Sequence, residues 1–422
     1  MPLSRHFYSL DEVHTAIQYT CNHGPPVEAL FWTQEMIYSG CVGEAISALF
    51  QAWLWNTGPM SLQWLLNATK SIASDELSEQ DILLAAHQLS SIHYSLRDSS
   101  IWNILVLTTV APNEMPDTIT RKVPPGADQY TDEKEFYFVC ALFQGKARAA
   151  WWAAQYIDTA RVWDILNWYV STGKTKYKDE YLICLKTLNN YEPLLGYQSV
   201  EYDTITRCCA IIAVALPPKA QIQSFKDLEY NIRQDGQEML SEFEKKVGRR
   251  QGRLYTIPKM ALYGTTLRGC SKWAHHNLTQ LYNIEKYLVG CTFWDEAIAE
   301  YGGVTDENGG QIEWTSDEKK EEFYAEYFPD DIPDEWSKMD QQKSHGDGIL
   351  GPTDKPNMVK YARMYMAKMS RFAWNTSNLI NTHLVRYGSV CALEKIVEGI
   401  PPVGLSEELS KRLKPVHKIK II

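Results

Sequence analysis

A group of acidic residues in the last third of the chain is the first candidate for chemistry. Divalent cations such as Mg²⁺ and Ca²⁺ prefer several oxygen ligands at once, and Pro329 and Pro333 would stiffen the segment that carries them. The candidate ligands are Asp330, Asp331, Asp334 and Glu335, with His345 and Asp347 downstream. Their spacing matches no metal-loop pattern, and acidic surface loops are common. We therefore favour a solvated or partner-facing loop over a metal site.

A basic stretch between residues 249 and 272 is the second candidate, because it could hold a negatively charged partner. Its cations are Arg249, Arg250, Arg253, Lys259, Arg268 and Lys272. Tyr255, Tyr263 and Trp273 lie among them, and such rings can stack on nucleic-acid bases while the cations contact phosphates. The same cations could dock the chain's own acidic segment, Asp317 to Glu335, or an acidic protein. We favour this second interpretation and keep nucleic-acid binding as the alternative.

Two shorter motifs resemble ligand sites but lack residues that such sites need. Gly173-Lys174-Thr175 matches the end of a phosphate-binding loop, yet Trp168 stands where that loop requires a glycine. We expect a helix C-terminus there instead. His275 and His276 are adjacent, so on a helix they would point about 100° apart and could not easily share one metal ion. The sequence also contains no H-E-x-x-H or G-x-S-x-G motif.

The composition is that of an ordinary globular protein with an unusual aromatic content. The 422 residues include 14 tryptophans and carry a formal net charge of −10. This charge argues mildly against nucleic-acid binding over the whole surface, although a local basic patch would survive it. The aromatic rings must be covered by a large helical core, by a partner, or by both.

Cysteine usage and hydropathy predict the compartment. Nine cysteines, none in a C-x-x-C pair, lie mostly in apolar runs, which predicts free, buried thiols in a reducing environment. Residues Met1 to Leu10 have no apolar core of the kind a signal peptide needs, and no run approaches 18 apolar residues. We therefore expect neither a signal peptide nor a membrane span, and a cytoplasmic location.

The elements that must position these residues begin between Leu10 and Trp55. Apolar residues recur there at helical spacing, interrupted by glycine- and proline-containing turns, which predicts three amphipathic helices. Ser78 followed by Asp81 predicts a capping box in front of a helix over residues 82–96. Pro217-Pro218 should end a helix, and a polar helix should run from residue 225 to 247. Gly302-Gly303 and Gly309-Gly310 should bracket a flexible loop.

An internal similarity indicates a duplication. Ala29-Leu30-Phe31-Trp32 has a counterpart in Ala149-Ala150-Trp151-Trp152, and each follows a turn that contains glycine. Two copies suggest helical hairpins stacked on one another, although chance resemblance between aromatic-rich helices would give the same pattern. We predict a helical repeat unit over residues 1–110, a linker over 111–128 and a second repeat unit over 129–247. An irregular region over 248–422 would carry the two charged patches and a final long helix, residues 358–384.

The expected fold is therefore mainly α, with stacked helical hairpins, either solenoid-like or a bundle, and an irregular C-terminal half.

Two stretches resemble known families. Glu28-Ala29-Leu30-Phe31-Trp32 resembles a helix in the collar domain of clamp-loader-type ATPases; that resemblance covers the first fifth of the chain and implies helical packing without the ATPase activity. The segments 253–258, 327–337 and 343–346 are similar to uncharacterised proteins of nucleocytoplasmic large DNA viruses. This second resemblance implies a viral factory or a virion and supplies no catalytic residue.

The resulting hypothesis is a non-enzymatic structural or interaction protein, such as an assembly or virion component of a large DNA virus. It would bind protein partners through aromatic helical surfaces and need no cofactor. The alternative is a metal-dependent nucleic-acid-processing or replication accessory protein, in which the acidic loop holds the cation and the basic stretch holds the strand.

Overall fold

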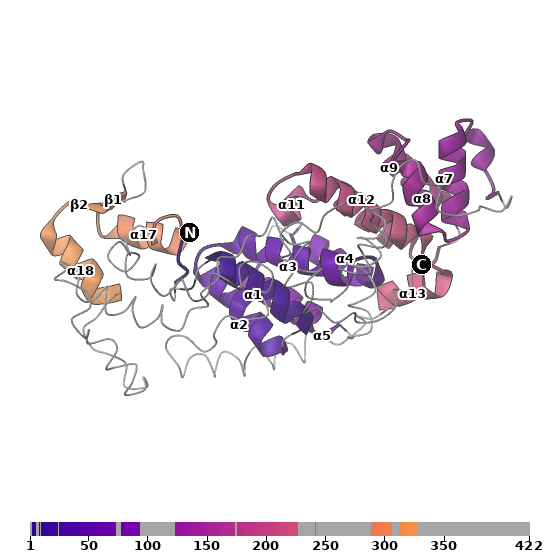
Figure 1. Ribbon diagram of the computed structural model, residues 1–422. Helices are drawn as coiled ribbons and strands as arrows, with labels where there is room; N and C mark the ends of the chain where they lie inside the picture. The colour runs from indigo at the N-terminus through magenta and orange to yellow at the C-terminus, as the bar shows by residue number, and fades with distance from the viewer. Residues whose placement is uncertain are drawn as a thin grey trace, which may run out of the picture. The chain divides into compact units, whose positions relative to one another are not determined.

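The computed structural model describes residues 2–5, 8, 10–23, 25–72, 77–92, 123–173, 175–226, 241, 288–305 and 312–327. Of the interpretable residues 76% are helical, and these parts of the chain contain 14 α-helices and one sheet of two strands. The prediction of a mainly α fold is confirmed (Figure 1). The described residues belong to two compact units: unit 1 draws on Met1–Thr20, Val27–Ala45 and Ser241–Arg386, and unit 2 on Cys21–Pro26 and Ile46–Leu240.

Three helices occupy the first 56 residues, as the spacing predicts. They are α1 (Leu10–His23), α2 (Pro26–Tyr38) and α3 (Val42–Asn56). The prediction that all three are amphipathic is wrong for α2, because every residue from Ala29 to Ile37 is buried, including Gln34 and Glu35. A helix that is covered on all sides lies within a core, and the mixed sequence of α2 does not reveal this by its spacing alone.

The N-terminal segment helps to cover α2 in unit 1. The Ser4 hydroxyl donates to the buried Glu35 carboxylate at 2.5 Å and accepts from the Tyr8 backbone N–H at 3.1 Å. The Tyr8 ring lies edge-on to Trp32, with centroids 4.9 Å apart. These contacts satisfy a buried carboxylate and bury aromatic area in the same place, which explains how polar residues are accommodated in this core.

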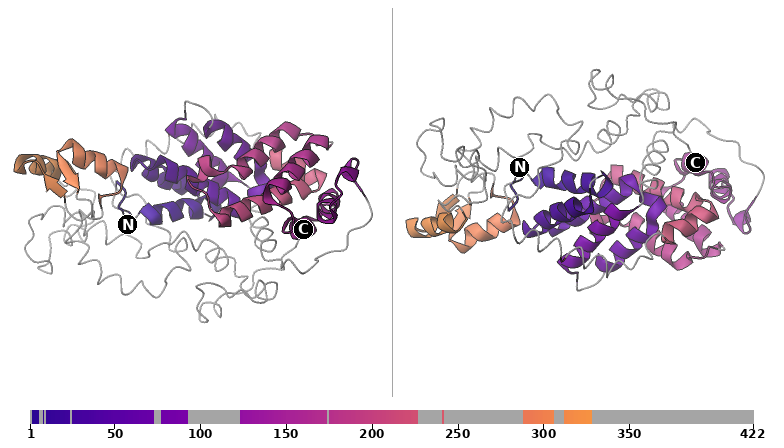
Figure 2. Two further views of the ribbon diagram at one scale, coloured as in Figure 1. Left: turned by 90° about the horizontal axis from the view of Figure 1, so that it is seen from above. Right: turned by 90° about the horizontal axis from the view of Figure 1, so that it is seen from below.

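The later part of unit 1 contains α17 (Thr292–Glu300), β1 (Gly303–Thr305), β2 (Ile312–Trp314) and α18 (Asp317–Tyr327), which group together in both views of Figure 2. The two strands pair antiparallel, with Val304 opposite Glu313. The prediction of a flexible loop between Gly302 and Gly310 is therefore wrong for residues 303–305, which form β1, whereas residues 306–311 lie outside the described residues. Strands this short carry too little alternation to be read from sequence.

A compact apolar cluster joins these elements to the start of the chain. Its buried members are Leu3, Leu288, Cys291, Trp294, Ala297, Ile298, Ile312 and Phe323. The Trp294 indole N–H donates to the Ser4 carbonyl oxygen at 3.0 Å. The acidic and aromatic α18 is thus amphipathic, with Phe323 buried and Asp317, Glu318, Glu321 and Glu322 exposed. Its aromatic residues serve packing within the chain.

Unit 2 begins with most of α3 and continues through the 3₁₀ helix η1 (Gly58–Ser61), α4 (Leu62–Ile72) and α5 (Glu79–Ser91). The predicted capping box is confirmed: the Asp81 N–H donates to Ser78 Oγ, and the Ser78 N–H donates to the Asp81 carboxylate, both at 3.2 Å. The helix starts at Glu79, because this pair satisfies N–H groups that a helix N-terminus leaves without partners.

The next four helices of unit 2 pack in consecutive pairs. Helices α7 (Glu133–Phe143) and α8 (Ala147–Ala154) contact each other, as do α9 (Thr159–Thr172) and α10 (Lys178–Asn189). Asp132 and Asp158 cap α7 and α9 through their carboxylates. Outside, the Lys134 ammonium lies over the rings of Trp152 and Tyr156, 4.5 and 5.1 Å from their centroids. Capping and cation–π contacts therefore fix the first pair where it meets solvent.

The last helices of unit 2 are α11 (Glu192–Leu195), α12 (Val200–Ala215) and α13 (Pro218–Lys226). Pro217 follows the end of α12, as predicted, but a further helix, α13, starts at Pro218. The polar helix predicted over residues 225–247 lies almost entirely outside the described residues. Proline fits the first turn of a helix because the N–H it lacks would have no intrahelical partner there. The pair of prolines thus ends one helix and begins another.

None of the described helices is by itself long and apolar enough to cross a membrane, and one bent pair, Tyr202–Ala215 with Pro218–Phe225, passes by length and composition alone. All seven described cysteines are buried and form no disulfide, in agreement with the prediction for this part of the chain.

Candidate functional site

Most of the sequence-predicted site residues lie outside the described residues. These are the six cations between Arg249 and Lys272 and the proposed metal ligands Asp330, Asp331, Asp334 and His345, together with the predicted helix over residues 358–384. Gly173 is described: it follows the last residue of α9, and its N–H donates to the Tyr169 carbonyl oxygen at 3.0 Å. The helix C-terminus expected at this motif is confirmed. Among the described residues, no three His, Cys, Asp or Glu side chains are placed to hold a metal ion.

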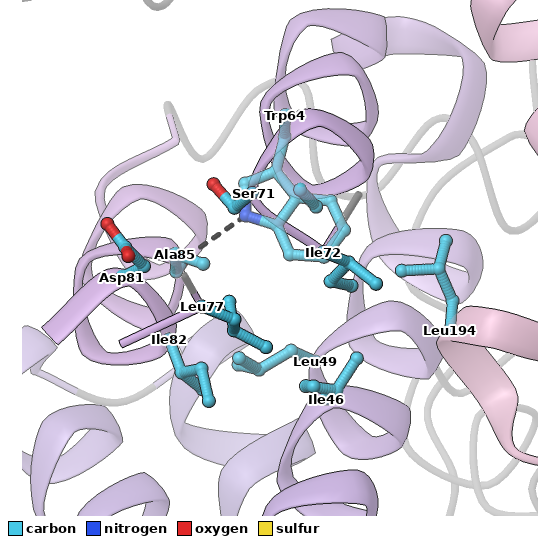
Figure 3. Close-up of a pocket in the computed structure, with 11 residues that line it drawn as sticks. Ile46, Leu49, Trp64, Ser71, Ile72, Leu77, Asp81, Ile82, Ala85 and Leu194 are labelled. Atoms are coloured by element: carbon cyan, nitrogen blue, oxygen red, sulfur yellow. Dashed lines mark hydrogen bonds between the residues drawn. The ribbon is translucent and has the colours of Figure 1, made fainter. Parts of the chain in front are cut away.

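The structure instead places a hollow in unit 2, between α3, α4, α5 and α11, with about 320 Å³ of empty volume that includes open solvent. Its lining residues are Ile46, Leu49, Trp64, Ala68, Ser71, Ile72, Leu77, Asp81, Ile82, Ala85 and Leu194 (Figure 3). We call it the α3–α5 pocket. Nine of these side chains are apolar, so the pocket offers a surface that water solvates poorly.

A stack of aromatic rings supports one wall of the pocket. Phe50 stacks on Trp53 with centroids 5.9 Å apart, and Trp53 stacks on Trp64 at 6.0 Å, with planes inclined by 21° and 18°. The Trp53 indole N–H donates to the Ser61 carbonyl oxygen at 2.8 Å, which fixes the middle ring. Trp64 is 2% exposed. The wall is rigid because three large rings are locked by packing and hydrogen bonding at the same time.

The opposite wall comes from α5, and a hydrogen bond ties the two walls together. The Trp64 indole N–H donates to the Ala85 carbonyl oxygen at 3.0 Å, drawn as a dashed line in Figure 3. The capping box fixes the first turn of α5, so Leu77 and Ile82 are held at the pocket. The aliphatic side chains of Ile46, Leu49 and Ile82 gather in the same view. The pocket is therefore preorganised by hydrogen bonds that lie outside its apolar surface.

The two polar side chains of the lining have little capacity for catalysis. Figure 3 shows the oxygen atoms of Ser71 and Asp81 at the margin of the group. One carboxylate oxygen of Asp81 already accepts from the Ser78 hydroxyl at 2.7 Å and from its N–H at 3.2 Å. A general base must reach the proton that it removes, and this carboxylate is engaged in holding a helix. The arrangement is suited to binding an apolar group.

The sequence indicates some residues of the α3–α5 pocket, but it does not indicate that they meet. The capping residue Asp81 of α5 and the apolar spacing that includes Ile46 and Leu49 of α3 are visible in the sequence. Leu194 is not, because it comes from α11, a helix of one turn that lies more than a hundred residues later. A pocket between helices depends on which faces meet, and no periodicity within one helix carries that information.

The titratable groups in the core of unit 2 are held neutral. Burial raises the pKa of the Cys208 and Cys209 thiols well above the usual value, and raises the pKa of the Cys184 thiol as well. Burial is also the main reason why the pKa of Tyr191 rises to about 12, and a hydrogen bond from its hydroxyl to Asp203 adds to the shift. A thiol needs to ionise to act as a nucleophile, so these cysteines serve as small apolar core residues.

Comparison of the chain with protein-family models, with curated proteins and with solved structures finds no match.

Proposed function

We propose that this chain is a non-enzymatic interaction protein, and that unit 2 binds an amphipathic helix of a protein partner by taking its leucine or isoleucine side chains into the α3–α5 pocket. The apolar lining of that pocket is the observation that supports the proposal most directly. Helices dock in this way when their apolar face fits a groove between other helices, at a spacing of three to four residues.

Two further features support a protein partner. Trp64 is fixed by its stack on Trp53 and its hydrogen bond to Ala85, so the wall of the pocket is already ordered before a partner binds. Ser71 and Asp81 lie at the edge, where a polar rim would surround the buried contact.

The test is to fill the pocket and measure association. Ala85→Phe adds a ring to the lining, while the Ala85 carbonyl oxygen that accepts from Trp64 belongs to the backbone and remains. Proteins that bind the full chain in its native host cell are first identified by cross-linking and mass spectrometry. We expect Ala85→Phe to weaken the interaction of the main partner at least about tenfold, a loss of about 1.4 kcal/mol.

The matched control is Ser91→Phe, which adds the same ring at an exposed position of the same helix that does not line the pocket. It should leave the interaction unchanged. Thermal unfolding of both variants would show that each is folded. Equal affinity of the partner for the Ala85→Phe variant and the unaltered chain would contradict the proposal.

For the biological setting we propose an assembly or virion component of a large DNA virus that acts in the cytoplasm, in viral factories or in the particle. The proposal rests on the resemblance of segments 253–258, 327–337 and 343–346 to proteins of such viruses that was noted from the sequence. Quantitative mass spectrometry of purified particles tests it: a virion component should keep a constant ratio to the major capsid protein through successive purification steps. A ratio that falls with each step would indicate a factor of the infected cell.

The metal-dependent nucleic-acid hypothesis remains a prediction from the sequence, since its residues lie outside the described part of the chain. Binding of single-stranded DNA at low salt, lost in an Arg249→Glu, Arg250→Glu double variant, would support it.

A further inference from the structure

Two cysteines from distant parts of the sequence meet in unit 1. Cys41 follows the turn between α2 and α3, and Cys291 is the residue directly before α17. Both sulfur atoms lie at hydrogen-bonding distance from one carbonyl oxygen, that of Ser39: Cys41 Sγ at 3.4 Å and Cys291 Sγ at 3.3 Å. Each thiol also shifts the pKa of the other, as expected for close neighbours. They therefore form a contacting pair.

The backbones on either side of the pair are also in close contact. The Phe293 N–H donates to the same Ser39 carbonyl oxygen at 3.1 Å. Gly40 has a φ of +73°, and a Cβ atom placed on it would lie 2.6 Å from the Thr292 Cβ. A disulfide requires its two Cα atoms to lie within about 7 Å of each other. Gly40 and Thr292 are the chain neighbours of Cys41 and Cys291, and their contact brings the two backbones close together.

The surroundings of the two thiols shift their pKa values in opposite directions. The pKa of Cys291 is lowered, because the Cys41 thiol and the backbone N–H groups of Trp294 and Phe293 at the start of α17 lie beside its sulfur and favour the thiolate. Burial and the Asp295 carboxylate oppose this shift. The pKa of Cys41 is raised, first by its interaction with the Cys291 thiol and then by burial, with a smaller contribution from the Glu44 carboxylate. Helix N-termini favour thiolates in the same way.

We propose that Cys41 and Cys291 are a redox modification site that forms a reversible disulfide when a hydroperoxide such as hydrogen peroxide oxidises it. Cys291 is the sulfur that reacts first, and Cys41 is the sulfur that resolves the intermediate. The disulfide joins the turn between α2 and α3 to the start of α17. Cys208 and Cys209 are neighbours on one helix and are as buried as Cys291, but burial raises the pKa of each, whereas the pKa of Cys291 is lowered, so they stay reduced.

The reaction balances in two steps. The Cys291 thiolate attacks one oxygen of hydrogen peroxide; the O–O bond breaks, an S–O bond forms, and the departing hydroxide takes up a proton to give water. The Cys41 sulfur then attacks the Cys291 sulfur; the S–S bond forms, the S–O bond breaks, and hydroxide leaves with the Cys41 proton as a second water. Two thiols lose two electrons in total, and the peroxide gains them. A dithiol such as dithiothreitol reverses the change.

The full chain itself allows a direct test. Cleavage after glutamate separates the two cysteines into peptides 36–44 and 286–296, each of which contains one cysteine. After brief exposure to stoichiometric hydrogen peroxide and alkylation with N-ethylmaleimide, we expect mass spectrometry to find these two peptides joined. The joined species should disappear on treatment with dithiothreitol, and peptides that contain Cys208 and Cys209 should stay unlinked.

Two serine variants separate the proposed roles. In Cys41→Ser the resolving thiol is absent, so dimedone should trap a sulfenic acid on Cys291. In Cys291→Ser, Cys41 should remain reduced and yield no dimedone adduct. Oxidation of the unaltered chain at Cys291 without a link to Cys41, or linkage of either cysteine mainly to another residue, would overturn the proposal.

Discussion

Burial of cysteine thiols links the core of unit 2 to the pH dependence of its stability. Cys208 and Cys209 are inaccessible on α12, and burial raises the pKa of each well above the ordinary value of 9.0. In the unfolded chain both would ionise above about pH 9, whereas in the folded chain they stay protonated. The folded state then holds more protons than the unfolded state, so stability falls as the pH rises above the unfolded value.

We therefore predict that the free energy of unfolding falls between pH 8 and pH 10, by about 1 kcal/mol for each such thiol. Urea unfolding of the reduced chain at the two pH values measures this. Cys208→Ala removes one of the groups, so it should reduce the fall even if it lowers stability at both pH values. An equal fall in the variant and in the unaltered chain would show that the Cys208 thiol does not contribute.

The residues that could be recognised from the sequence are those whose partners lie close along the chain. The capping pair Ser78 and Asp81 is one example, and Gly173 at the end of α9 is another. The contact of Cys41 with Cys291 could not be recognised in this way, because it spans about 250 residues. Composition predicts that the thiols are buried, but it does not say which of them meet.

At the scale of elements, the turn between α2 and α3 depends on a glycine. Gly40 has a φ of +73°, and a side chain there would collide with Thr292, whereas Gly43, inside α3, has no atom within 4 Å of where a Cβ would stand. We predict that Gly40→Ala lowers the free energy of unfolding by about 1–3 kcal/mol or more, since it combines a left-handed backbone with a steric clash.

Gly43→Ala should raise the same free energy by up to about 1 kcal/mol, because alanine favours a helix over glycine. Chemical denaturation of both variants, in the presence of a reductant, provides the comparison. If the two substitutions changed stability by the same amount, the close approach of Gly40 to Thr292 would not exist in solution.

Elements also differ in how far the sequence predicted them. The helices from α1 to α5 follow from apolar spacing and turn residues, because each buries one stripe or is bounded by clear breaks. The burial of α2 on all sides, the start of α13 at Pro218 and the β1–β2 hairpin were not predicted. In each case contacts with other elements decide the outcome, and local propensity does not distinguish the alternatives.

At the scale of the whole molecule, two compact units predict two unfolding events. Ser78→Ala removes the capping box of α5 in unit 2 and should cost about 1 kcal/mol, whereas Gly40→Ala acts in unit 1. In differential scanning calorimetry we expect each substitution to lower the temperature of a different transition. A single transition that both substitutions shift equally would show that the two units unfold together.

The sequence alone determined the helical class of this protein, the three helices before residue 56 and the burial of its described thiols, because these follow from spacing and composition within short stretches. It did not place every helix boundary: the helix predicted over residues 82–96 runs from Glu79 to Ser91. The duplication and the domain limits predicted from it remain predictions. Only the tertiary structure decided that Leu194 completes a pocket with Trp64, that Cys41 meets Cys291, and that α2 is covered on every side. The physical reason is the same for all three: each depends on which surfaces meet when distant segments pack, and packing is a property of the folded chain as a whole.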